Sequence, residues 1–220
     1  MKSPAYWNSA FYRFFVRYVW RKKKNQARNW AIVSQWVPHG VSVVEVAAGC
    51  GEFYEAALCG KVSSYVALDV NPAFVKAMTQ KGIQAMRTDV LTAPVPVGDT
   101  VIMMSAFYHF KEHGDGVLTK LLNSARRNVI LVEPVNNPLD SRRWRDRLRA
   151  VLVSMGEGPI YERYLADELL RLCERHATVL HHQLMHDNDY LVVLQGQALP
   201  TEGEGSKTPF AATEKGGDGD

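Results

Sequence analysis

Two glycines and an aspartate in the first half of the chain have the spacing of a nucleoside-binding site. The heptapeptide EVAAGCG at 45–51 follows a β-branched run and precedes a helical pattern. Small residues let the backbone turn sharply and approach a ligand, and the amides that open a helix can meet a polar group. Asp69 ends the next apolar run, 20 residues after Gly49. Because an acidic side chain there can accept both ribose hydroxyls, the pattern predicts a nucleoside cofactor.

A nicotinamide dinucleotide is the first alternative for this site. Its fingerprint has a third glycine where the helix packs closely against the strand. With Gly49 and Gly51 as the first two glycines, that third place falls on Tyr54, a bulky ring. This disfavours a pyrophosphate site. The other alternative is that the glycines only make a turn, and the coincidence of strand, turn, helix and distant acid argues against it.

A histidine at the end of a later strand is the candidate for proton transfer. His109 lies in the sequence SAFYHF at 105–110, at the carboxyl edge where parallel sheets bind their ligands. An ordinary imidazole pKa of about 6.5 suits proton transfer at neutral pH. We therefore consider His109 as a general base for an acceptor that loses a proton, with Tyr108 shaping the pocket. The alternative is that His109 only packs against a neighbouring loop.

Three other histidines raise the question of a metal site. His181 and His182 are adjacent on an expected strand, so their side chains point to opposite faces. His186 follows in a turn, and no carboxylate or cysteine completes an obvious ligand set. We expect a surface edge strand here and no metal.

Alternating strands and helices must position these residues. Short apolar runs predict strands at 41–47, 64–70, 83–86, 100–104 and 128–132. Helical patterns stand at 52–58, 72–81, 116–125, 140–154 and 167–176. Two late runs, 177–185 and 190–195, alternate as a hairpin. The sequence thus predicts an α/β fold: a Rossmann-like, doubly wound, mainly parallel sheet with an antiparallel hairpin at one edge.

Composition divides the chain into three parts. Eight aromatic residues lie in 5–20 and a basic run follows, so we expect an aromatic and basic lid helix over 1–29. The Rossmann-like domain is expected at 30–199, and 200–220 is predicted to be a disordered tail because it has few large apolar residues. Three interpretations of the leading helix stay open: a lid over the cofactor, an interfacial helix on anionic lipid, and a helix packed on the core.

Charge and cysteine content limit the class of protein. The net charge of +3 is too small by itself to indicate nucleic-acid binding. Three irregularly spaced cysteines argue against a disulfide framework and fit a reducing cytoplasm. No apolar run reaches the ~20 residues that a membrane helix needs. We expect a cytoplasmic protein, with peripheral membrane contact through the leading helix as a further prospect.

From about residue 30 to 195 the sequence resembles the class I S-adenosylmethionine (SAM)-dependent methyltransferases, in particular those that act on small molecules. VVEVAAGCGEF is similar to their first motif, ALDVNP to the second and MRTDVL to the third. DTVIMMSAFYHF is similar to the fourth, and RRNVILVEPV to the strand that follows it. The visible departure is Ala47, where the family has the first glycine of a triplet.

The resemblance implies SAM as the cofactor and assigns residues to its methionine end. Glu45 would lie near the methionine moiety through the loop. Ala47, Gly49 and Gly51 would present their backbone to the cofactor. Alanine is the smallest replacement for the missing glycine, so cofactor binding is still expected.

The resemblance also assigns residues to the nucleoside and to the methyl group. Asp69 would hold the ribose, with Val70 beside the adenine. Asp89 would reach the adenine amino group, with Val90 against the ring; the alternative for Asp89 is a loop or helix cap. Ser105 would line the floor near the transferable methyl.

The expected function is methyl transfer from SAM to a small hydrophobic, aromatic or lipid-like acceptor. The sulfonium carries the reactive group, so the protein must align the acceptor and exclude water. The aromatic residues of 5–20 favour an apolar or planar acceptor, such as a quinone-like, lipid or aromatic metabolite. We expect a small-molecule substrate, and the sequence does not indicate an oligomeric state.

Two other functions remain as alternatives. An RNA methyltransferase would use the arginines between 142 and 149 and the basic run 21–24 to contact phosphates. The motif SAFY, however, lacks the proline pair typical of enzymes that methylate exocyclic base amines, and the Pro-Cys of cytosine-5 enzymes. A non-catalytic SAM-binding partner subunit comes last, because nothing in the motifs looks destroyed.

Overall fold

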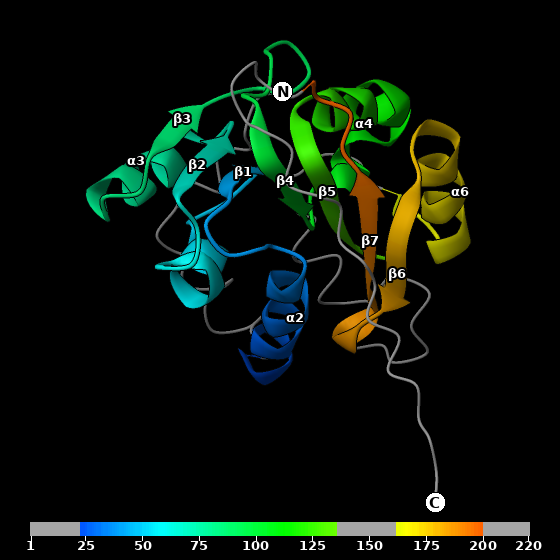
Figure 1. Cartoon of the computed structure of the whole chain (residues 1–220), viewed down its shortest axis with the longest axis horizontal. Coiled ribbons are helices and arrows are strands. Elements are labelled where there is room, and N and C mark those ends of the chain that lie inside the picture. The colour runs from blue at the N-terminus through cyan, green and yellow to red at the C-terminus, as the bar shows by residue number, and fades with distance from the viewer. Residues whose placement is uncertain (1–22, 136–161, 200–220) are drawn as a thin grey trace, which may run out of the picture.

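Seven strands form one sheet in the computed structural model, which describes residues 23–135 and 162–199 (Figure 1). Their order across the sheet is β3-β2-β1-β4-β5-β7-β6. The bounds are β1 Ser42–Val46, β2 Ser64–Asp69, β3 Ala85–Arg87, β4 Gly98–Met104, β5 Ala125–Pro134, β6 Val179–Leu184 and β7 Asp189–Gln195. All seven fall within or close to the runs that the sequence predicts.

The sheet is parallel from β3 to β5 and antiparallel beyond it. β1 pairs with β2 on one side and with β4 on the other. β7 inserts between β5 and β6 and is antiparallel to both. The predicted Rossmann-like sheet with an antiparallel hairpin at one edge is therefore confirmed. Because the chain order reverses at β1, the carboxyl ends of β1 and β4 flank the switch point where such sheets bind ligands.

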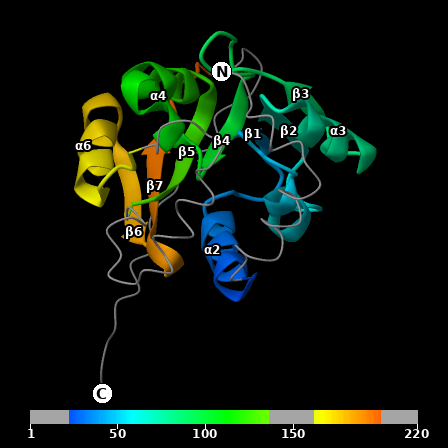
Figure 2. The same ribbon diagram turned by 180° about the vertical axis from the view of Figure 1, so that it is seen from behind.

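Helices cover both faces of the sheet. Their bounds are α2 Lys23–Gln35, η2 Tyr54–Leu58 (a π-helix), α3 Pro72–Gln80, η3 Phe107–His113 (a 3-10 helix), α4 Gly114–Asn123, α6 Ala166–His176 and the short η5 His186–Asn188. Seen from behind, α4 and α6 lie beside β5, β6 and β7, and α3 lies beside β2 and β3 (Figure 2). Asn71 caps α3 by accepting the N–H of Ala73 at 2.9 Å, with Pro72 at the first helical position.

The alternation of side chains on each strand divides the core in two. On β1, Val44 packs into one cluster with α4 and α6, and Val43 packs into the other with α2, η2 and α3. Leu121 of α4 is fully buried in the first cluster and Val33 of α2 in the second. Each such side chain contributes roughly 1.5–3 kcal/mol through its burial. The two layers hold the strand ends, and hence the site residues, in fixed positions.

Two expectations about element bounds change. Helix α2 runs across the expected boundary between residues 29 and 30 and buries Val33 in the core. The predicted helix at 116–125 begins at Gly114 and ends at Asn123, because β5 already begins at Ala125. The expected helices in 1–22 and 140–154 and the expected tail from 200 lie outside the described residues. Within the described ranges, no helix combines the length and apolarity needed to cross a bilayer.

Candidate functional site

The turn after β1 needs left-handed backbone at alternate positions. Ala47, Gly49 and Gly51 have φ values of 58°, 60° and 72°. The N–H of Ala48 donates to the Leu68 carbonyl at 3.1 Å, which fixes the turn to the end of β2. A left-handed conformation is free for glycine but costs an L-residue about 1–2 kcal/mol. The structure therefore explains the two glycines and shows that Ala47 holds a strained conformation.

The two glycines of the turn face different surroundings. A Cβ at Gly51 would lie 2.8 Å from Ile83 Cδ1 and 3.2 Å from Met78 Cγ, so Gly51 lets the turn pack against α3 and the residues after it. At Gly49, apart from the glycine itself and its two chain neighbours, no described atom lies within 4 Å of such a Cβ. Gly51 thus serves packing, and Gly49 leaves open space beside the end of β2.

Asp69 stands at the end of β2 as the spacing predicts. Its Oδ2 accepts the N–H of Gly49 at 2.9 Å, and its Oδ1 accepts the N–H of Asn71 at 2.8 Å. Burial raises the pKa of Asp69 to about 6, while these N–H donors oppose the rise. Each carboxylate oxygen has two lone pairs, so both can still accept a hydroxyl proton. The residue can hold a diol beside the open position at Gly49.

Glu45 lies within β1 and is buried. Its Oε2 accepts the hydroxyl proton of Tyr65 at 2.5 Å, and the Tyr65 ring stacks on Tyr54 with centroids 4.3 Å apart. Burial raises the pKa of Glu45 to about 7, partly offset by the Tyr65 hydrogen bond. Tyr65 was not predicted from the sequence, because the partner of a buried acid on a neighbouring strand follows from strand register and leaves no local motif.

The residues assigned to the adenine lie along the next loops. Val70 is half-buried directly after Asp69. Asp89 Oδ1 accepts the N–H of Leu91 at 3.1 Å, which is the loop cap that stood as the alternative for this residue. Val90 is 4% exposed and packs in the core. Lys120 of α4 donates to the carbonyls of Val90 and Leu91, both at 2.8 Å, so α4 helps to hold this loop. Contact of Asp89 and Val90 with the adenine stays a prediction.

A second strained residue follows β4. Ser105 is exposed, has a φ of 53° and donates its N–H to the Val132 carbonyl at 2.7 Å. Ala47 and Ser105 therefore give the carboxyl ends of the neighbouring strands β1 and β4 the same left-handed break. Strain of this kind in non-glycine residues clusters at ligand sites. The structure brings Ser105 to the edge that also carries the glycine turn.

Glu133, which was not predicted as a site residue, holds the segment after Ser105. Its Oε1 accepts the N–H groups of Ala106 at 2.9 Å and Phe107 at 2.8 Å, and its Oε2 accepts that of Tyr108 at 3.2 Å. The side chain is 0% exposed, and burial raises its pKa to about 7 against the effect of the N–H donors. The available signal was one acid inside the apolar run of β5.

Tyr108 and His109 lie at the start of η3 with their rings packed together, 4.1 Å between centroids. The guanidinium of Arg163 lies over the Tyr108 ring, 5.6 Å from its centroid. Burial, and to a lesser degree the charge of Arg163, lowers the pKa of His109 to about 4. With this pKa the imidazole is uncharged at neutral pH and is a weak base. General-base catalysis works best with a pKa near the operating pH, so His109 is poorly suited to that role.

The two adjacent histidines of β6 have separate partners. His181 stacks on Trp36 with centroids 4.7 Å apart, and His182 Nδ1 lies 2.8 Å from the Tyr190 hydroxyl. In 23–135 and 162–199, no group of three or more His, Cys, Asp or Glu is arranged to hold a metal ion.

Comparison with known proteins supports the fold. No family model matches the chain, and no curated protein does. Among solved structures, magnesium protoporphyrin IX methyltransferase (ChlM) of Synechocystis PCC 6803 with bound S-adenosylhomocysteine (SAH) has a TM-score of 0.68 at 14% identity, covering 87% of this chain and 96% of that one. A chain in the complex of the Haloferax volcanii Trm112 methyltransferase activator with a methyltransferase scores 0.66 at 14% identity, covering 90% and 100%.

A third structure shares the fold with a different activity. The [4+2]-cyclase SpnF has a TM-score of 0.61 at 12% identity, covering 78% of this chain and 81% of that one. At 12–14% identity these likenesses show one thing, the fold of the class I SAM-dependent methyltransferases. The chemistry of this chain has to be argued from its own residues.

Proposed function

We propose that this chain is a SAM-dependent methyltransferase that methylates a small acceptor with an apolar body. One observation carries the proposal: the Asp69 carboxylate is fixed against the N–H of Gly49, beside a left-handed turn with open space at Gly49. A nucleoside lying across this turn can place its ribose on Asp69 and its polar tail on the turn backbone. The site lies at the switch point between β1 and β4.

The residues present fit this cofactor. Asp69 retains lone pairs for the ribose hydroxyls, and its carboxylate, which is ionised above a pKa of about 6, favours a cationic ligand over a neutral one. When bound, SAM supplies a methyl group activated by its sulfonium. The ChlM structure that shares the fold was solved with SAH, the product form of SAM.

The chain's own part in methyl transfer is to orient the acceptor and keep water out. Ser105 is exposed at the edge beside the turn, and Tyr108 and His109 follow it on η3. The uncharged His109 can accept a hydrogen bond from an acceptor hydroxyl or amine. Its low pKa makes this positioning role a better fit than full proton abstraction.

The proposed acceptor class rests on where the aromatic segment joins the described structure. Asn29 of α2 donates to Asp189 Oδ2 at 2.9 Å, and Asn25 donates to Asp187 Oδ1 at 3.1 Å. Asp189 pairs with Pro134 at the carboxyl end of β5, and α2 lies beside the turn between β6 and β7 (Figures 1 and 2). The chain therefore enters α2 from the edge that carries the site. The aromatic residues of 5–20 precede α2 in the sequence, and their composition favours an apolar acceptor.

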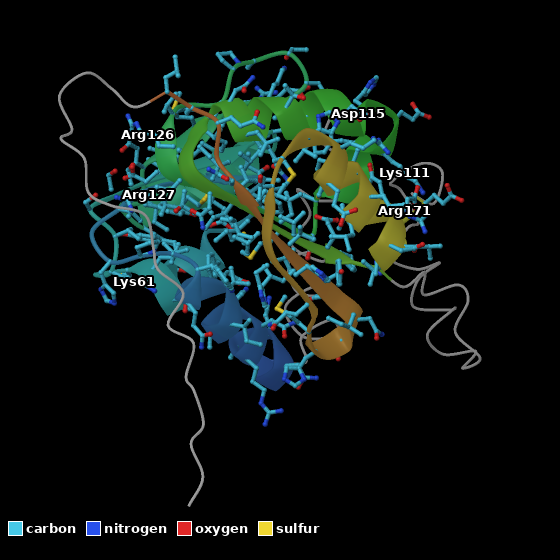
Figure 3. The ribbon with its side chains drawn as sticks, turned by 45° about the vertical axis from the view of Figure 1, so that its right-hand side comes forward. Lys61, Lys111, Asp115, Arg126, Arg127 and Arg171 are labelled. Atoms are coloured by element: carbon cyan, nitrogen blue, oxygen red, sulfur yellow. The ribbon has the colours of Figure 1, made fainter. Side chains whose placement is uncertain are left out.

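The RNA alternative has less support from the described residues. Figure 3 shows Lys61, Arg126 and Arg127 on one side of the molecule and Lys111, Asp115 and Arg171 on the other. Lys61 precedes β2 and the two arginines lie at the start of β5, so this group is at the amino edge of the sheet. Arg126 and Arg127 also lie 3.7 and 4.0 Å from Asp99. These three cations stand at the edge opposite the glycine turn, whereas Lys81 donates to the Cys50 carbonyl within that turn. The arginines of 142–149, on which the RNA alternative depends, lie outside the described residues.

The test of the proposed function is methyl transfer itself. The full chain is incubated with SAM labelled in its methyl group and with separate small-molecule, lipid and RNA fractions of a cell extract, and labelled products are identified by mass. We expect label in an apolar small molecule or lipid. Label in RNA alone would favour the RNA alternative. SAM binding without any labelled product would favour the partner subunit, or a reaction without methyl transfer such as that of the cyclase SpnF.

A further inference from the structure

The first amides of η3 have no cap from their own segment. Ala106 occupies the N-cap position and makes no side-chain cap hydrogen bond. The first N–H groups of a helix have no partner within the helix, so they need an acceptor from elsewhere. Glu133 supplies it from the next strand by accepting three consecutive N–H groups. The start of η3 is thus anchored to β5 by a single side chain.

The position of Glu133 makes this anchor unusual. Its neighbours Leu131, Val132 and Val135 are buried apolar residues, and an apolar side chain at 133 would be the ordinary choice for a central strand. A buried carboxylate is unfavourable unless hydrogen bonds compensate it. Here the compensating N–H donors all belong to the segment after β4.

The same segment carries the acceptor side of the site. Ser105, with its left-handed backbone, directly precedes the three bonded amides, and Tyr108 is itself one of the three. The His109 ring packs on the Tyr108 ring. A change at Glu133 would therefore shift these side chains together, while Asp69 and the glycine turn, on β1 and β2, keep their own hydrogen bonds.

We infer that Glu133 is a positioning residue for the acceptor, acting through the backbone of Ala106 to Tyr108 to fix Tyr108 and His109 beside Ser105. The inference rests on the proposed function for its meaning in catalysis. Its geometry can be tested without knowing the acceptor.

The variant Glu133→Gln is close in shape but has one acceptor oxygen. It can keep the bonds to Ala106 and Phe107, and it sets an NH₂ group against the N–H of Tyr108. Thr100→Val is the matched control. It breaks the buried hydrogen bond of 2.7 Å between Thr100 Oγ1 and Asn128 Oδ1, in the same strand pair at the amino edge.

Methyl transfer is measured with a dilution series of the extract fraction that the wild type labels. For Glu133→Gln we expect the maximal rate to fall at least tenfold and the half-saturating amount of the fraction to rise, with SAH affinity within twofold of wild type by calorimetry. Thr100→Val should lower the melting temperature and leave the maximal rate within twofold. A Glu133→Gln variant with wild-type rate and half-saturation, or one that loses SAH affinity as much as rate, overturns the inference.

Two measurements apply even if no fraction is labelled, and the first applies even if the variant does not fold. In the wild type, hydrogen exchange followed by NMR should show the amides of Ala106, Phe107 and Tyr108 protected, although they open a helix; rapid exchange of all three overturns the inference. In folded Glu133→Gln, the packing around His109 should loosen. The pKa of its imidazole should then rise, with at least a tenfold increase in proton affinity. An unchanged value overturns the inference. Absence of both SAH binding and labelled product in the wild type overturns the proposed function instead.

Discussion

The carboxylate of Asp69 accepts the backbone N–H of Gly49 at 2.9 Å, which ties the end of β2 to the turn after β1. Its other oxygen accepts the N–H of Asn71, the cap of α3. One side chain thus fixes the turn, the strand end and the next helix relative to one another. A ligand that binds Oδ2 of Asp69 would therefore lie close to the backbone of Gly49.

The two glycines of the turn offer a matched pair of variants. Gly49→Ala places a methyl in open space, so it should cost only the left-handed strain of about 1–2 kcal/mol but lower SAH affinity at least tenfold. Gly51→Ala drives a methyl against Ile83 and Met78 and should cost a further ~1–3 kcal/mol of stability through overpacking. Urea denaturation and calorimetry measure the two effects. Wild-type affinity in Gly49→Ala would contradict the placement of the ligand.

Ala47 predicts a stabilising substitution. Ala47→Gly relieves a left-handed strain of about 1–2 kcal/mol in the folded protein. The greater conformational freedom of glycine in the unfolded chain offsets roughly 0.4–1 kcal/mol of this gain. The free energy of unfolding should therefore rise by about 0.5–1 kcal/mol, measured by urea denaturation. A decrease would show that the alanine methyl makes favourable contacts that outweigh the strain.

The raised pKa of Glu45 predicts a pH dependence of stability. The group ionises near 4.5 in the unfolded chain and near 7 in the folded protein. Between these values the folded protein holds more protons, so this carboxyl's contribution to the free energy of unfolding falls as the pH rises and is largest below the unfolded value.

Glu45→Gln removes that dependence. Relative to wild type, the free energy of unfolding of the variant should increase by on the order of 1 kcal/mol for each step of one in pH across this window. Urea denaturation of both proteins at the two ends of the window gives the difference. A difference that stays constant with pH would show that Glu45 is ionised throughout.

His109 should stay uncharged in the folded protein at neutral pH. Burial and Arg163 lower its pKa to about 4, so NMR titration should show no protonation of this imidazole near its ordinary pKa of about 6.5. A measured pKa near the ordinary value would instead support a general base at this position.

The sequence predicts what depends on local pattern. The spacing predicted the positions of the glycine turn and of Asp69 at the end of β2, because a strand, a turn and a distant acid have fixed spacing in this kind of sheet. The start of β5 was missed because Arg126 and Arg127 interrupt its apolar run, and they lie at the strand's amino end beside Asp99. The helical pattern after the turn was found, but its π-helical form was not.

The sequence does not show which residues the fold brings together from separate strands. The pairs Glu45 with Tyr65 and Glu133 with the amides after β4 depend on strand register. Helix α2 was missed as a separate element. Its sequence is polar for much of its length, and contacts such as that of Asn29 with Asp189 hold it in place.

Calorimetric titration with SAH tests the central claim most directly, using wild type, Asp69→Asn and Asp99→Asn. Asp99 is a matched control, because its carboxylate also accepts a backbone N–H, that of Ser42 at 2.8 Å, but lies at the amino edge. We predict binding to wild type and to Asp99→Asn with similar affinity. Loss of hydrogen bonds to a charged group, worth about 1.5–3 kcal/mol, should weaken binding to Asp69→Asn at least tenfold. Absence of binding to wild type, or equal affinity in all three proteins, would contradict the account.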